Sequence, residues 1–190
     1  MQDLEKLKYP IGKYNPPKTI TETQLKEWID QLALLPQEII DISLGLTEHQ
    51  LEIQYRPNGW TARQVIHHLA DSHINAYTRI RLTLTENRPE VRPYDEVKWA
   101  TLTDAKSADI NLSIAILKSI HERLVILLKT LQAHDFERRY YHPAAKQEFT
   151  LAYLVGNYAW HGKHHLAHIQ LTLNVDGDTN TEQNDVPHQN

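Results

Sequence analysis

Four long segments of this chain repeat apolar residues at the intervals of an α-helix, and this periodicity restricts the fold more than any other feature. Residues three or four apart lie on one face of a helix, so each segment can turn one apolar stripe toward a common core. Glycine, which weakens helices, occurs only six times in 190 residues. A chain of this length forms one core more readily than two. The sequence therefore predicts an all-α fold in one domain.

The starts and ends of the helices can be placed from capping residues and proline. Thr21 and Thr61 are each followed three residues later by glutamine, which is the spacing of a capping box. Pro36 is expected to kink or restart the first helix, because proline lacks the N–H that a helix interior uses. The four predicted helices cover about residues 21–44, 60–86, 107–131 and 150–175.

The segments outside these helices are mostly expected to be ordered. Residues 1–20 contain three prolines and predict an extended N-terminal arm that lies on the body of the bundle. Residues 88–106 and 134–149 are long and aromatic, which is typical of connections that cover a site, and RRYYHP and QEFT in the second of them can pair as a hairpin. We therefore expect one domain over residues 1–175, and a disordered polar tail over residues 176–190.

Composition excludes several classes of function. The formal net charge is −4 and no basic run occurs, so a nucleic-acid partner is not expected. No segment approaches the roughly 20 consecutive apolar residues of a membrane span, and the first residues lack an apolar signal core. Cysteine is absent, which excludes disulfides, thiolate ligands and a cysteine nucleophile. We therefore expect a cytoplasmic protein with neither nucleic acid nor membrane as partner.

Histidine is the residue that departs from an ordinary composition, with 12 in the chain. Without cysteine, a transition metal would need imidazole and carboxylate ligands. Phase along the fourth helix places His161 and His165 on its inward side, one turn apart, where two imidazoles can bind one ion. The same phase puts His164 near the opposite face and His168 at the margin. The pair at i, i+4 is therefore the candidate for metal binding.

The second helix leaves the choice of a further ligand open. Its phase rejects His67, which points away from the apolar stripe, and keeps both His68 and His73 as candidates. His121 lies on the inward stripe of the third helix, where a core histidine is the favoured interpretation and a cavity-lining residue is the alternative. The segment WHGKHH lacks the glutamate of the HExxH zinc proteases, so it does not supply their general base.

Five segments together resemble the YfiT family of metal-dependent hydrolases, a branch of the DinB-like superfamily. They are YPIGKY, GWTARQVIHHLADSHINAYTRIRLTLTE, RPYDEVKW, YYHP and WHGKHHLAHI, which occur in this order over about residues 9–170. The resemblance implies a DinB-like four-helix bundle, a homodimer and one divalent ion per chain, zinc first and nickel second. Carried over residue by residue, the family's three ligands fall on His68, His161 and His165, which decides the open choice on the second helix.

Three functions are compatible with such a site. The resemblance to the YfiT family implies a hydrolase, in which the metal activates water against a small-molecule substrate. Relatives across the wider superfamily imply the alternative of an S-transferase, in which the metal activates a low-molecular-weight thiol such as bacillithiol or glutathione. In the third, the ion is not catalytic and only stabilises the bundle or a dimer.

Charged residues near the expected site are weaker candidates for a role. Asp71, Asp95 and Glu96 could each act as a general base, although a surface carboxylate is the simpler interpretation. Arg79 or Arg81 could hold the acidic groups of a thiol. The sequence assigns no catalytic residue beyond the metal ligands.

Overall fold

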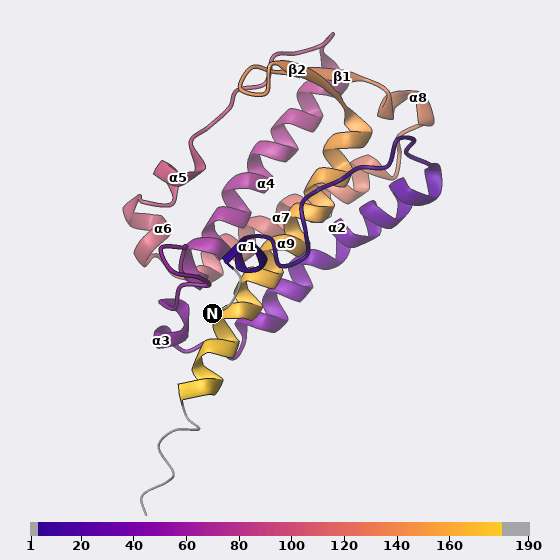
Figure 1. The fold of residues 1–190 in the computed structure, drawn as a ribbon. Helices are drawn as coiled ribbons and strands as arrows, with labels where there is room; N and C mark the ends of the chain where they lie inside the picture. Colours follow the sequence, from indigo (N-terminus) through magenta and orange to yellow (C-terminus); the bar gives the residue numbers. More distant parts are fainter. Residues whose placement is uncertain (1–3, 180–190) are drawn as a thin grey trace, which may run out of the picture.

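The computed structural model describes residues 4–179, and the side chains of residues 4–173. Its body is a bundle of four long helices, which confirms the predicted all-α four-helix fold (Figure 1). These helices are α2 (Glu22–Ser43), α4 (Ala62–Thr85), α7 (Ile110–Leu128) and α9 (Leu151–Thr179). Among the described residues, no helix is long and apolar enough to cross a membrane.

The order of the helices around the bundle differs from their order along the chain. Helix α4 packs on α7 and α9, and α2 packs on the same two helices, so α2 and α4 face each other across the bundle. The neighbours α4 and α7 run parallel, because His67 near the start of α4 contacts Ser113 near the start of α7. Two consecutive helices that run parallel begin at the same end of the bundle, so the connection between them must cross back along the length of the bundle. Residues 86–109 make this return, and Figure 1 shows them running back beside α4.

The connections contain short elements. The helical ones are α1 (Leu4–Lys8) in the N-terminal arm, α3 (Glu48–Leu51), α5 (Glu96–Trp99), α6 (Thr103–Ser107) and α8 (Ala133–Phe136). Strand β1 (Arg139–His142) pairs antiparallel with β2 (Gln147–Thr150), and Tyr140 lies opposite Phe149. This pair is the hairpin that the sequence predicts in the last long connection.

Helix α2 continues through Pro36, so the predicted restart at this proline is wrong. Proline cannot donate to the carbonyl four residues earlier, which is that of Leu32. This carbonyl instead accepts from Nδ1 of His121 on α7, at 2.6 Å. The helix therefore satisfies its backbone at a position where it cannot bond to itself.

Other boundaries depart from the predictions by a few residues. The third predicted helix corresponds to α7, which begins at Ile110 and ends at Leu128, because Asp109 caps its start by accepting from the N–H of Asn111 at 2.9 Å. The N-terminal arm contains the short helix α1 before its extended part. Helix α9 extends to Thr179 and takes in the first residues of the predicted tail. Residues 180–190 of that tail lie outside the described residues.

The buried apolar side chains form two clusters, one toward each end of the bundle. One cluster includes Leu25, Ile80, Leu124, Leu151 and Val155, and the other includes Ile39, Val65, Leu69, Leu117 and Ile169. Between them, each of the helices α4, α7 and α9 contributes histidine rather than an apolar residue. The bundle therefore has a layer of imidazoles between the two apolar clusters. This imidazole layer consists of His68 and His73 on α4, His121 on α7, and His161, His165 and His168 on α9.

Helix α9 approaches α2 closely at two glycines. A Cβ atom at Gly156 would lie 2.6 Å from Cζ3 of Trp28, and one at Gly162 would collide with the side chain of Leu35. Only glycine lets the backbone of α9 pack this closely against the side chains of α2. Because Gly162 lies between His161 and His165, this contact fixes the turn of α9 that carries both histidines.

Candidate metal centre

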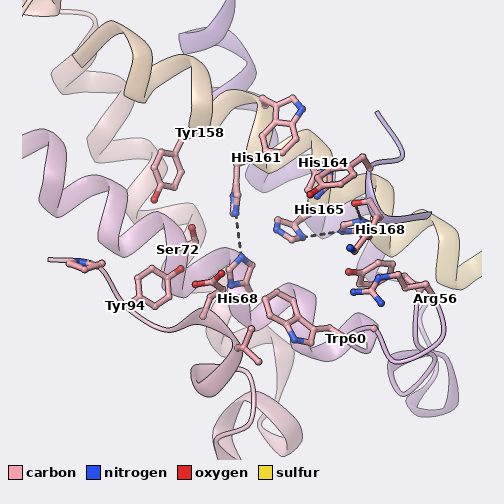
Figure 2. Close-up of a pocket in the computed structure, with 18 of the residues that line it drawn as sticks. Arg56, Trp60, His68, Ser72, Tyr94, Tyr158, His161, His164, His165 and His168 are labelled. Carbon is pink, nitrogen blue, oxygen red and sulfur yellow. Dashed lines mark hydrogen bonds between the residues drawn. The ribbon is translucent and has the colours of Figure 1, made fainter. Parts of the chain in front are cut away.

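Three histidines from two helices meet in the imidazole layer. His68 comes from α4, and His161 and His165 come from adjacent turns of α9 (Figure 2). One ring nitrogen from each lies within 4.8 Å of the others, and Nε2 of His68 is 3.3 Å from Nε2 of His161. The structure therefore brings together the three histidines that the sequence predicts as metal ligands.

The spacing and the charge state of these rings fit a zinc ion. Tetrahedral Zn–N bonds of about 2.0–2.1 Å separate two ligand nitrogens by about 3.3–3.4 Å, which is the observed distance between His68 and His161. Burial lowers the pKa of His68 to about 4 and the pKa of His161 and His165 well below the ordinary value, and neighbouring imidazoles add to the effect. All three rings are therefore neutral at pH 7, which is the state that binds a metal.

The three histidines line an open cavity of about 630 Å³. Tyr94 in the connection between α4 and α7, and His142 in the hairpin, line it as well, so both long connections cover the site as predicted. An ion held by three protein ligands beside such a cavity keeps coordination positions open, as in catalytic rather than structural zinc sites.

The cavity has more positive than negative side chains. Lys8, Arg56 and Arg79 line it, whereas Glu96 is the only carboxylate that lines it in the described part of the chain. Neither arginine forms an ion pair within the described part of the chain, and the Nε atom of each is buried without a hydrogen-bond partner. Arg79 donates to Tyr158 Oη at 3.4 Å and to the carbonyl of Arg92 at 3.1 Å. These cations are therefore available to a negatively charged ligand.

Of the three carboxylates considered as a general base, one faces the cavity. Glu96 lines it, whereas Asp71 does not. Burial raises the pKa of Asp71 to about 6, with a smaller contribution from Asp104. Asp95 caps α5 by accepting from the N–H of Lys98 at 3.0 Å. The cavity thus offers Glu96 as its carboxylate.

The two arginines considered for ligand binding are also separated by the structure. Arg79 lines the cavity, whereas Arg81 does not and donates to Tyr77 Oη at 3.0 Å. The guanidinium of Arg81 lies 5.3 Å from the centre of the Tyr77 ring. Arg79 is therefore the candidate for contact with a substrate.

The structure corrects the expected surroundings of His164. Phase placed it near the opposite face of the helix, yet the N-terminal arm covers that face and leaves His164 7% exposed. Its ring lies 5.9 Å from that of Tyr9 and stacks on Trp160 at 4.6 Å. His164, His165 and His168 form a second set of imidazoles with nitrogens within 4.8 Å of one another. Helical phase alone does not show which segment covers a helix from outside.

The remaining histidines of α4 and α7 have hydrogen-bond partners of their own. His67 lies away from the ligands, as predicted, and its ring contacts Ser113 Oγ at 2.7 Å and the carbonyl of Ala108 at 3.2 Å. His73 is completely buried behind His161, with its Nε2 3.3 Å from Nδ1 of His161. His121 is a core histidine, as favoured, and contacts His73 rather than the cavity that the ligands line.

The sequence of this chain is similar to those of known proteins. The sequence matches the family described as the DinB superfamily over residues 31–169. A Bacillus pumilus protein named "Putative metal-dependent hydrolase" is 51% identical over 163 residues, which are 86% of this chain and 93% of that protein. "Putative metal-dependent hydrolase YfiT" of Bacillus subtilis is 47% identical over 163 residues, 86% of this chain and 92% of its own.

The fold also matches a solved structure. That structure is of YfiT from Bacillus subtilis, described as "a probable metal-dependent hydrolase with an unusual four-helix bundle topology". It superposes with a TM-score of 0.88 at 45% sequence identity, and the match covers 90% of this chain and 98% of the other.

Proposed function

This chain belongs to the DinB superfamily and to its YfiT branch, and from this we propose that it is a metal-dependent hydrolase acting on a small molecule. The observation that carries the proposal is the set of three neutral imidazoles, with nitrogens within 4.8 Å of one another, on the wall of an open cavity. His68, His161 and His165 would hold one divalent ion per chain. Imidazole binds both zinc and nickel, and the 3.3 Å between Nε2 of His68 and Nε2 of His161 favours the tetrahedral geometry of zinc.

The residues around the ligands have complementary roles in this proposal. A zinc ion bound by three histidines supplies a Lewis acid and lowers the pKa of bound water to about 7. Glu96, as the carboxylate of the cavity, would accept the proton of the attacking water. Burial raises the pKa of Tyr94 to about 12, so its phenol stays protonated and can donate a hydrogen bond to the substrate.

The charge of the cavity favours an anionic substrate. Arg56 and Arg79 are half-buried and have no carboxylate partner among the described residues, and a partly desolvated cation without a counter-ion is unfavourable. A substrate carboxylate would supply that counter-ion and could bind an arginine through two parallel hydrogen bonds. The proposed substrate is therefore a small ester or amide that carries a carboxylate away from the bond to be cleaved.

A pair of esters that differ in charge tests this function. Zinc-loaded protein, purified without a histidine tag, is offered p-nitrophenyl glutarate, which has a free carboxylate, and p-nitrophenyl butyrate, which has none. We expect hydrolysis that a chelator abolishes and zinc restores, with a higher kcat/KM for the glutarate ester. The control is His68→Ala, which should show no rate above background. Absence of metal-dependent cleavage of any ester or amide tried would contradict the proposal.

The alternative is an S-transferase, and one observation favours it: of the described residues, Glu96 alone brings a carboxylate to the cavity. A metal that stabilises a thiolate needs no general base, and the unpaired arginines would hold the carboxylates of bacillithiol or glutathione. In the test, the thiolate displaces chloride from monochlorobimane, forming a C–S bond while the C–Cl bond breaks. A metal-dependent rate with either thiol, absent in His68→Ala and without ester cleavage, would decide for the transferase.

The non-catalytic reading is the weakest of the three. A purely structural zinc site is closed by four protein ligands, whereas these three histidines adjoin a cavity of about 630 Å³. The homodimer implied by the family resemblance stays a prediction, which sedimentation of the purified protein checks.

A further inference from the structure

We infer that His73, His121 and His168 are positioning residues for the metal centre. Through two hydrogen-bond chains, each ending on a backbone carbonyl, they fix the tautomer and direction of the two α9 ligands, His161 and His165. The inference rests on the proposed metal site, and it explains why the bundle buries more histidines than the ion itself needs.

The first chain begins at the carbonyl of Leu32. A carbonyl can only accept, so Nδ1 of His121, 2.6 Å away, must carry the hydrogen. A neutral imidazole has one donor and one acceptor, so Nε2 of His121 accepts from Nδ1–H of His73 at 2.8 Å. His73 then accepts at its Nε2 from Nδ1–H of His161, at 3.3 Å. The remaining nitrogen of His161, its Nε2, is left with a free lone pair.

That lone pair is aimed at the metal position. Nε2 of His161 is the atom that lies 3.3 Å from Nε2 of His68. The other tautomer of His161 would direct an N–H at the ion and could not bind it. Neither His73 nor His121 is more than 1% exposed, and neither has a carboxylate partner within residues 4–179, so charging either ring would bury an unpaired cation.

The first hydrogen-bond chain ends on the carbonyl of Leu32 because residue 36 is a proline. In an unbroken helix the N–H of residue 36 would bond the carbonyl of Leu32, but proline has no N–H. A buried carbonyl without a partner is costly, and His121 supplies the missing donor. The proline within α2 thus creates the acceptor on which three consecutive imidazoles are aligned.

The second chain fixes His165 from the side of the N-terminal arm. The carbonyl of Lys8 accepts from Nε2–H of His168 at 3.2 Å, so Nδ1 of His168 is an acceptor. It lies 3.3 Å from Nδ1 of His165, which therefore carries the hydrogen and leaves Nε2 free for the ion. Figure 2 shows the two rings joined in this way. His168 is held in plane by stacking on Tyr55, with ring centres 3.9 Å apart.

Both chains therefore present an Nε2 lone pair before any ion arrives. Groups that hold metal-binding histidines through the other ring nitrogen typically change metal affinity by about 10–100-fold when removed. His73 and His121 do not line the cavity, so neither is expected to contact the ion or a substrate. The inference nevertheless predicts an effect of that size on metal affinity from both.

Tautomers can be read directly in the metal-free protein. Long-range ¹H–¹⁵N correlation spectra of chelated, ¹⁵N-histidine-labelled protein at neutral pH distinguish Nδ1–H from Nε2–H rings. We expect the Nδ1–H form at four positions, His73, His121, His161 and His165, and the Nε2–H form at His168. An Nε2–H ring at both His161 and His165 would overturn the inference. This measurement needs no variant and no enzymatic activity.

Zinc affinity, measured by competition with a chromophoric chelator, tests the consequence. His121→Phe and His168→Phe interrupt one chain each, and each should raise the dissociation constant about 10–100-fold. The matched control is His67→Phe, a buried histidine of α4 outside both chains, which should stay within about threefold of the wild type. Pro36→Ala restores a donor for Leu32 and should weaken binding less than His121→Phe, since a carbonyl accepts two bonds.

The outcomes separate this inference from the proposed function. Unchanged affinity in both phenylalanine variants overturns the positioning role, whatever reaction the protein catalyses. If the wild type binds no divalent ion, the proposed function fails, while the tautomers of the metal-free protein still decide how the two chains are polarised. Thermal melts of each variant confirm that the affinities compare folded proteins.

Discussion

Adjacent histidines of α9 provide their own control for the assignment of ligands. His165 faces His68 and His161, whereas His164 stacks on Trp160 beneath the N-terminal arm. In protein purified without a tag, we expect about one divalent ion per chain by elemental analysis, which His161→Ala or His165→Ala should largely remove. His164→Ala should keep the ion. An empty site in His164→Ala together with a full one in His161→Ala would show that the second histidine set is the true centre.

Arg79 and Arg81 differ in the same useful way. Both are arginines of α4, but only Arg79 lines the cavity. If it binds a substrate carboxylate, Arg79→Gln should raise KM for the carboxylated ester about tenfold, a loss typical of one charge-assisted hydrogen bond, with little change in kcat. The uncharged ester should be unaffected, and so should both esters with Arg81→Gln. Equal losses on both esters would indicate damage to the site rather than loss of a charge contact.

Single residues show where prediction from sequence succeeds and where it stops. Phase on α9 and the family resemblance predicted that His68, His161 and His165 face one another, and the three rings do lie together, because helix geometry fixes direction. The chain through His121 was out of reach, because phase gives the face of a side chain and not its partner on another helix. Pro36 was misread as a break for the same reason, since the donor that replaces its N–H comes from α7.

At the scale of helices, the contact between α9 and α2 carries a prediction. A Cβ at Gly162 would press on Leu35, and overpacking of this kind costs about 1–3 kcal/mol. Gly162→Ala should therefore lower the free energy of unfolding by that amount, measured by urea denaturation of the metal-free protein. Gly45→Ala is the matched control, because a Cβ there meets nothing within 4 Å. Equal stability of the two variants would mean that α2 yields to the added methyl group.

The same substitution should act on the metal centre. Because Gly162 lies between the two α9 ligands, a shift of the helix moves both nitrogens relative to His68.

The fold itself was largely predictable: four helices, their caps at Thr21 and Thr61, and the hairpin followed from periodicity and turn residues. The start of α7 at Ile110 was not, because Asp109 as a cap resembles any exposed aspartate in sequence.

On the scale of the whole molecule, a bound ion should add to the stability of the bundle without being required for its fold. Two apolar clusters flank the layer, so we expect the metal-free protein to keep its helical circular dichroism and to melt cooperatively, at a lower temperature than the metal-bound form. The difference should grow with free zinc above the dissociation constant, by mass action. Loss of helicity on chelation at room temperature would show that the ion is part of the fold.

The sign of the pH dependence follows from the buried rings. Burial lowers the pKa of His68 and of His164 to about 4 and that of His168 to about 3, with a smaller contribution from neighbouring rings for His68 and His168. Histidines of an unfolded chain titrate near about 6.5, so between that pH and about 4 the unfolded state binds more protons than the folded one. Stability should therefore fall as the pH falls through this window and change little above it. Asp71, whose pKa is raised to about 6, acts in the opposite direction but is one group against several.

Melting curves with and without chelator, at half-unit steps from pH 4 to pH 8, check both effects. Without metal, the melting temperature should decline on the acid side, and His68→Leu should make the decline shallower because it removes one such group. With zinc, the decline should be steeper, since protons then compete with the ion for the same nitrogens, and the curves with and without chelator should converge as the ion is released. A metal-free protein equally stable at pH 5 and pH 7 would show that the histidines of the layer reach water and titrate normally, which contradicts their burial in this fold.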